Sequence, residues 1–183
     1  MGLLACNNCD RLKEEKYQID LITDSVFVSS IHRLFSNLSE PDLTNANFES
    51  YRLLVLSPVE NGTKGIIILS KTENGCILKT INFGRRNIGD STIAYIKDTS
   101  IKVMPKEKWL AFEDLIYASK YWTLLRCEES NSIEGIGYFL EASRPQARLC
   151  NKRTHQIVLR QAPAKDDLFS FVCELLLFNS TLK

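Results

Sequence analysis

Two histidines and one Cys-x-x-C pair are the residues whose types and spacing point to metal or redox chemistry. Cys6 and Cys9 match half of a zinc site, which needs a second pair of Cys or His at similar spacing. His32 and His155 are the only histidines, and each stands alone in the sequence. A thioredoxin-like redox pair lies between a strand and a helix, whereas Cys6 and Cys9 lie in a polar leader. We therefore expect no metal site and no redox pair.

Motifs for the common catalytic and cofactor sites are absent from the sequence. The chain has no G-x-S-x-G, no Walker A, no dinucleotide-binding glycine motif and no H-E-x-x-H. A Ser–His or Cys–His arrangement would have to use His32 or His155, and we expect both rings to lie at the surface. The sequence thus predicts no catalytic residue and no cofactor, and it leaves open whether the protein is an enzyme.

Arg52 and Glu141 are the charged residues with the clearest structural context. Each lies at one end of an otherwise apolar strand, where its side chain could point into the helix-covered face of a sheet. We predict that Arg52 and Glu141 pair across the sheet and form part of a binding site. A buried ion pair adds little net stability, but removing one partner costs about 3–5 kcal/mol. Because no nucleophile or second base is nearby in the sequence, a structural pair is favoured over a catalytic one.

The longest basic run lies between residues 142 and 165, which contain six bases and no acid. The six are Arg144, Arg148, Lys152, Arg153, Arg160 and Lys165. Proteins that bind single-stranded nucleic acid place aromatic rings among the bases, and this segment has no Phe, Tyr or Trp. Nucleic acid is therefore disfavoured. A protein-binding surface and a solvated basic edge that discourages aggregation remain the alternatives.

Leu3-Leu4-Ala5-Cys6 has the form of a bacterial lipobox, in which cleavage of a signal leaves a cysteine that carries the lipid. A secretory signal needs a basic segment and about 7–15 apolar residues before the cleavage site. Only five residues precede Cys6, so either the signal begins upstream or the match arose by chance. A lipid on Cys6 would be the only membrane attachment and would place the protein in the bacterial cell envelope. Without it, the expected location is the cytoplasm.

The overall composition is typical of an ordinary globular protein. Of 183 residues, 44% are hydrophobic and 25% are charged, and the formal net charge is +1. Such a balance produces no overall field that attracts the chain to nucleic acid or membrane. Four of the six cysteines lie in apolar segments, where we expect free buried thiols. These are Cys76, Cys127, Cys150 and Cys173.

Apolar runs separated by turn signals predict two groups of strands, each followed by a helix. The first group has strands at residues 52–57, 65–71, 76–83, 91–96 and 100–104, and its helix at residues 105–121. The second has strands at residues 136–141, 147–151 and 155–160, and its helix at residues 166–178. The polar residues 85–90 are expected to form a loop. Residues 20–38 have the apolar spacing of a helix, although their β-branched run also suits a strand.

These elements predict a single α+β domain over residues 21–183, preceded by a polar leader or linker over residues 1–20. We expect one antiparallel sheet of about six to seven strands in two β-meander–α units. The two main helices each carry an apolar stripe, and they bury it best on one face of that sheet. The other face is then solvated, covered by the N-terminal segment, or free to bind a partner.

A set of segments in fixed order resembles a family of uncharacterised bacterial proteins, some of which carry lipoprotein signals. The likeness covers residues 49–178 and consists of a Glu49–Leu54 strand, a strand leading into the Trp109 helix, Tyr121-Trp122-Thr123-Leu124, the Gly137–Glu141 strand, a strand ending near Pro163 and an apolar helix with Cys173. The resemblance implies a bacterial source, one α+β domain and an envelope location. It transfers no catalytic residue.

Two functions remain open from the sequence. The favoured one is a non-enzymatic protein-binding or structural domain that presents an open sheet face or the basic run to an unknown protein partner. The other is an enzyme of unknown reaction, with a site built from dispersed Arg, Glu and Cys residues. A pocket with Arg52, Glu141 and a thiol of lowered pKa would favour the enzyme. A flat, exposed apolar patch would favour the binding domain.

Overall fold

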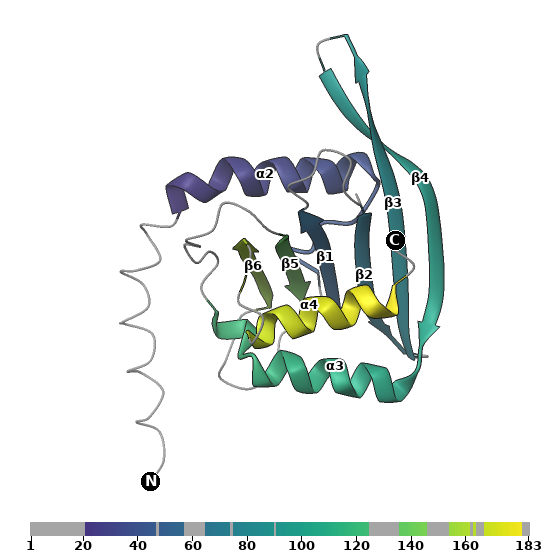
Figure 1. Ribbon diagram of the computed structural model, residues 1–183, viewed down its shortest axis with the longest axis vertical. Coiled ribbons are helices and arrows are strands. Elements are labelled where there is room, and N and C mark those ends of the chain that lie inside the picture. The colour runs from purple at the N-terminus through teal and green to yellow at the C-terminus, as the bar shows by residue number, and fades with distance from the viewer. Residues whose placement is uncertain are drawn as a thin grey trace.

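The computed structural model describes residues 21–46, 48–56, 65–73, 75–89, 91–124, 136–145, 154–161, 163 and 167–180. These residues form a six-stranded antiparallel sheet with helices against it, so the predicted α+β class is confirmed (Figure 1). The strands are β1 (Ser50–Leu56), β2 (Gly65–Thr72), β3 (Gly75–Ile88), β4 (Ser91–Met104), β5 (Gly137–Ser143) and β6 (His155–Gln161). The helices are α2 (Leu21–Asn37), α3 (Lys106–Ala118) and α4 (Leu168–Asn179), with a 3-10 turn at Tyr121–Thr123.

The strand order β4-β3-β2-β1-β5-β6 follows from two meanders that meet at β1. Strands β1 to β4 are joined by successive antiparallel pairings, and α3 follows β4. Strand β5 then pairs with the free edge of β1, β6 pairs with β5, and α4 follows. The predicted pair of β-meander–α units is thus confirmed, with β1 at the junction between them.

Helices α3 and α4 lie on the same face of the sheet, as predicted, and contact each other. Helix α3 buries Trp109, Phe112 and Ile116, and the ring of Phe112 meets the ring of Tyr51 edge-on at 4.8 Å between centroids. Helix α4 buries the row that contains Phe169 and Val172. This face of the sheet therefore carries a continuous core of aliphatic and aromatic side chains.

The opposite face of the sheet is covered by α2, so the segment that could have been helix or strand is a helix over Leu21–Asn37 (Figure 1). Ile31, Phe35 and Leu38 are buried against the strands, in one cluster with Leu54 and Phe139. Of the three alternatives for this face, coverage by the N-terminal segment is the one that the structure shows. The N-terminal helix covers the centre, and on the β4 side of this face Ile96, Ile101 and Val103 remain exposed.

Strands β3 and β4 continue past the sheet as a two-stranded ribbon, which differs from the prediction of a loop at residues 85–90 (Figure 1). Each polar residue of 85–88 has a cross-strand partner, and that pairing keeps the chain extended in spite of its composition. The two strands expected at residues 91–96 and 100–104 form one strand, β4, whose pairing with β3 shifts register between Asn82 and Phe83. Gly84 leaves room for its partner, because a Cβ there would lie 2.7 Å from the ring of Tyr95.

Several sequence predictions fall on residues outside those described. They are the leader at residues 1–20 with Cys6, the strand expected at residues 147–151, and the thiols of Cys127 and Cys150. The other two cysteines, Cys76 and Cys173, are free and buried, as predicted. Across the described ranges, the helices are too short or too polar to cross a bilayer.

Candidate functional site

Arg52 of β1 and Glu141 of β5 are direct cross-strand neighbours at the centre of the sheet. Arg52 Nη1 lies 3.6 Å from Glu141 Oε2, and the side chains are 2% and 1% exposed. The predicted pairing across the sheet is confirmed. The pair lies on the α2 face rather than under α3 and α4, because the alternating side chains of Tyr51 and Leu53 occupy the α3/α4 face.

The guanidinium of Arg52 is held between α2 and the segment that follows it. Its Cζ lies 4.1 Å from the centroid of the Phe35 ring, and its Nη2 donates a hydrogen bond to the carbonyl oxygen of Pro41. Burial lowers the pKa of Arg52, and the charges of Glu141, Glu40 and Asp42 oppose that shift. Since an arginine stays protonated in proteins, the site contains a fixed buried cation.

Both histidines of the described chain meet the carboxylate of Glu141. His155 Nε2 lies 2.8 Å from Glu141 Oε1, and His32 Nε2 lies 3.3 Å from the same oxygen. The side chain of His155 is only 18% exposed, so the expectation that it lies free at the surface is wrong. His32 is 36% exposed, and its Nε2 is turned inward to the buried carboxylate.

The positions of the histidines follow from local geometry. In β6, His155 lies two residues before Ile157, so both side chains point to the α2 face. In α2, His32 lies three residues before Phe35 and therefore on nearly the same side of the helix. The spacing of His155 from Ile157 and that of His32 from Phe35 are both visible in the sequence. They predict a shared site only once it is known that α2 covers this face of the sheet.

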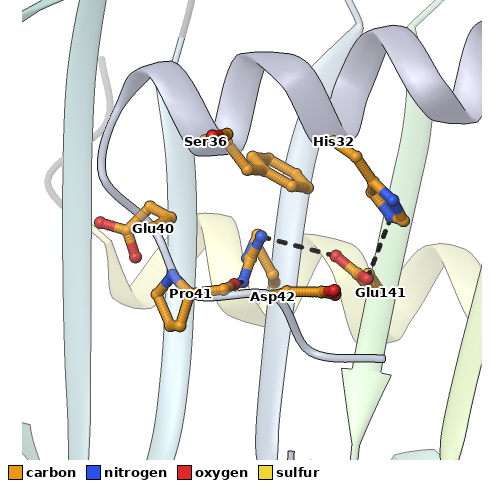
Figure 2. A pocket seen from close by; sticks show the side chains of 8 residues that line it. His32, Ser36, Glu40, Pro41, Asp42 and Glu141 are labelled. Carbon is orange, nitrogen blue, oxygen red and sulfur yellow. Dashed lines mark hydrogen bonds and ion pairs between the residues drawn. The ribbon is translucent and has the colours of Figure 1, made fainter. Parts of the chain in front are cut away.

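A pocket of about 300 Å³ opens above the pair, between α2, the segment after it, β1 and β5 (Figure 2). Its wall contains three carboxylates, one guanidinium, one imidazole, one hydroxyl and two apolar side chains. The lining residues are His32, Phe35, Ser36, Glu40, Pro41, Asp42, Arg52 and Glu141. The site is thus small, lined by more polar than apolar residues, and built from elements far apart in the sequence.

Two of the three carboxylates have their own partners. Lys79 Nζ lies 2.6 Å from Glu40 Oε1, which ties β3 to the segment after α2. Asp42 Oδ1 accepts a hydrogen bond of 2.9 Å from the backbone N–H of Thr44. That backbone hydrogen bond is the main reason why the pKa of Asp42 is lowered. Glu141 is the carboxylate left with incomplete hydrogen bonding.

Three buried polar atoms of this site have no hydrogen-bond partner among the described residues. They are Arg52 Nε, Glu141 Oε2 and His32 Nε2. The 3.6 Å between Arg52 Nη1 and Glu141 Oε2 is an ion-pair distance but is too long for a hydrogen bond. A donor and an acceptor are therefore both buried and unsatisfied in the same small site.

The basic run does not join this site where it can be followed. The guanidinium of Arg144 lies 4.0 Å from the ring of Trp122, and that of Arg160 lies over the ring of Phe169. Both rings belong to the α3/α4 side of the sheet. Arg160 is also buried, which removes it from any phosphate-binding surface. The other proposed bases, Arg148, Lys152 and Arg153, with Lys165, lie outside the described residues.

In the parts of the chain that the structure describes, His, Cys, Asp and Glu side chains do not gather in groups able to hold a metal ion. Comparison with known proteins found no family model that matches the chain and no match among curated proteins. The family resemblance seen in the sequence therefore stays a prediction, and function has to be inferred from the geometry.

Proposed function

We propose that this protein is a non-enzymatic protein-binding domain whose partner adds an extended segment along β4. The observation that carries the proposal is a stripe of exposed aliphatic side chains on that strand. Ile96, Ile101 and Val103 are 46%, 65% and 75% exposed. Solvated side chains of this size on one strand are a feature of surfaces that bind another chain.

The three side chains of the β4 stripe point to the same face. Ile96 is the cross-strand neighbour of Phe83, which is buried in the α2 cluster. Val103 and Ile101 follow on the same side of β4, opposite Ile77 and Lys79. The stripe is therefore the part of the α2 face that α2 leaves exposed, and it retains in part the sheet face expected to bind a partner.

Strand β4 is also an edge of the sheet. An edge strand offers unpaired backbone N–H and C=O groups, so an extended peptide can bind by main-chain hydrogen bonds while its side chains contact the stripe. Besides Lys79, which is paired with Glu40, the described charged residues of β3 and β4 are four bases and one acid: Arg85, Arg86, Lys97 and Lys102, with Asp98. We therefore expect the partner segment to alternate apolar residues with acidic ones.

The enzyme alternative has less support. It calls for a thiol of lowered pKa beside Arg52 and Glu141, and the two thiols that can be described lie elsewhere. Cys76 and Cys173 are buried in the α3/α4 core, where burial raises the pKa of both. The lipid anchor on Cys6 and the envelope location remain predictions that concern residues outside those described.

The test is a selection from a displayed library of random ten-residue peptides against the purified protein. Peptides that support the proposal alternate apolar and acidic residues and slow hydrogen exchange of β4 amides when bound. Ile101→Ser should weaken their binding at least about tenfold, roughly 1.4 kcal/mol. Tyr117→Ser is the matched control, because Tyr117 is an equally exposed apolar residue on α3 and its loss should leave binding unchanged.

Two results would contradict the proposal. Selected peptides that protect α3 or α4 and lose affinity with Tyr117→Ser would move the interface to the other side of the molecule. Concentration-dependent self-association that Ile101→Ser abolishes would make a second copy of this chain the occupant of the β4 edge.

A further inference from the structure

The pocket above Arg52 and Glu141 is a second candidate binding site, separate from the β4 stripe. We propose that it binds a small neutral polyol, that is, a molecule with hydroxyl groups on adjacent carbons. The proposal does not depend on the β4 stripe, since the lining of the pocket contains no residue of β4.

The site buries a donor and an acceptor that have no hydrogen-bond partner among the described residues. Arg52 Nε is a buried donor and Glu141 Oε2 is a buried acceptor, and both residues line the pocket. Leaving such groups without a partner is costly, so hydrogen bonds from a bound molecule to both groups would stabilise its complex with the protein. A hydroxyl group is suited to this, because one oxygen both donates a hydrogen bond and accepts others.

The wall of the pocket carries charges of both signs. An anion would face Glu40, Asp42 and Glu141, which line the pocket together. A cation would be placed beside the guanidinium of Arg52, which stays charged even though burial lowers its pKa. Because both signs of charge are present and already buried, a neutral ligand is favoured over an ion of either sign.

The polar groups border the pocket from more than one side. Figure 2 shows Asp42 and Glu141 approaching the pocket from one side and α2, with Ser36 and His32, bordering it on the other. Acceptors and donors thus surround one space, which suits hydroxyl groups on neighbouring carbons. The volume of about 300 Å³ is at the lower end of small-molecule sites and fits a molecule of monosaccharide size.

The probes are myo-inositol and D-glucose, measured by saturation-transfer NMR and titration calorimetry on the full chain. Both should bind saturably with a dissociation constant in the millimolar range, whereas ethanolamine and acetate, a cation and an anion, should bind more weakly. Glu141→Gln is the direct variant, but Glu141 is buried against Arg52 and its replacement can disturb folding. The decisive variant is therefore Ser36→Phe, which fills the pocket from an exposed position.

The matched control is Ser29→Phe. Ser29 is exposed on the same side of α2, two helical turns before Ser36, and it does not line the pocket. Ser36→Phe should weaken polyol binding at least about tenfold, and Ser29→Phe should leave it unchanged. The proposal is overturned if neither polyol binds, if Ser36→Phe binds as well as the wild type, or if ethanolamine or acetate binds more tightly than both polyols.

Discussion

The two faces of the sheet are built from the same strands but are stabilised in different ways. The face under α3 and α4 is a continuous apolar core, and the Tyr121 hydroxyl buried in it donates hydrogen bonds to the carbonyl oxygens of Leu140 and Gln156. The face under α2 has an apolar cluster of its own, but Arg52 and Glu141 interrupt its centre. Among the described residues, all three buried side-chain polar atoms that have no hydrogen-bond partner belong to the α2 face.

This difference separates stability from binding. In a fully apolar layer, every side chain that is buried away from water stabilises the folded state. In a buried ion pair, the attraction between the charges offsets little more than the cost of removing them from water. Unsatisfied donors and acceptors add to that cost. We infer that the α3/α4 face holds the fold together, while the α2 face gives up some stability for groups that can bind a ligand.

The largest effect is expected from a truncation in the α3/α4 core. Phe112 is fully buried and packs against Tyr51 and Trp109. Phe112→Ala should lower the free energy of unfolding by about 3–5 kcal/mol, from lost burial and the cavity left behind. Urea denaturation measures it. Leu110→Ala, at an exposed position of the same helix, should cost less than about 1 kcal/mol. Similar losses for the two variants would mean that α3 does not cover the sheet as described.

Breaking the ion pair from one side should cost slightly less. Arg52→Met leaves Glu141 buried without its cation, which costs about 3 kcal/mol. The value lies at the lower end of the usual range because His32 and His155 still lie beside the carboxylate. Thermal and urea denaturation measure the loss. An unchanged melting temperature would show that the interaction between Arg52 and Glu141 does not contribute to stability.

The double variant Arg52→Met with Glu141→Leu sharpens the comparison of the two faces. It turns the centre of the α2 face into an apolar layer like that under α3 and α4. Its stability should return to within about 1 kcal/mol of the wild type or exceed it, since replacing both members of a buried pair is often neutral or stabilising. A double variant less stable than Arg52→Met alone would contradict the view that the pair lowers stability.

The apolar face was the more predictable of the two from sequence. The helical spacing of Trp109, Phe112 and Ile116 depends on residues close together in the chain, and so does the strand pattern that located Arg52 and Glu141. The cluster around Glu141 depends on contacts between elements far apart. His32 reaches it only because α2 lies across the sheet, and no local pattern encodes that placement.

The β3–β4 ribbon was missed for a related reason. Residues 85–88 are mostly polar, and composition alone favours a loop. Their extended form comes from pairing with residues 91–94 across the turn at Gly89, whose φ is +58°. Cross-strand partners thus determined the conformation of this segment more strongly than its own residues did.

A smaller loss is expected when the buried hydroxyl of Tyr121 on the α3/α4 face is removed. Burial raises the pKa of Tyr121 well above its usual value, so its hydroxyl stays protonated and able to donate. Tyr121→Phe keeps the ring and should cost about 1 kcal/mol, the net value of a buried hydrogen bond. Urea denaturation provides the measurement. A loss as large as that of Phe112→Ala would mean that the hydroxyl, rather than the ring, holds the 3-10 turn in place.

The smallest effect concerns pH and the α2 face. The hydrogen bond from the Thr44 N–H lowers the pKa of Asp42 below 3.8, its value in the unfolded chain. The carboxylate therefore stabilises the folded state fully above that pH, and its contribution is lost as the pH falls through the lowered folded pKa. Asp42 is exposed, so solvent screening keeps the effect below about 1 kcal/mol.

Asp42→Asn is the variant that isolates this contribution, because the amide oxygen can still accept from Thr44 but carries no charge. The difference in unfolding free energy between wild type and Asp42→Asn should be greatest near neutral pH and should disappear in acid. Added salt should reduce it, since the contribution is electrostatic and lies at the surface. Urea denaturation at a series of pH values measures the difference. If it grew as the pH fell, the Asp42 carboxylate would be destabilising, and the α2 face would contain one more unsatisfied charge than its geometry indicates.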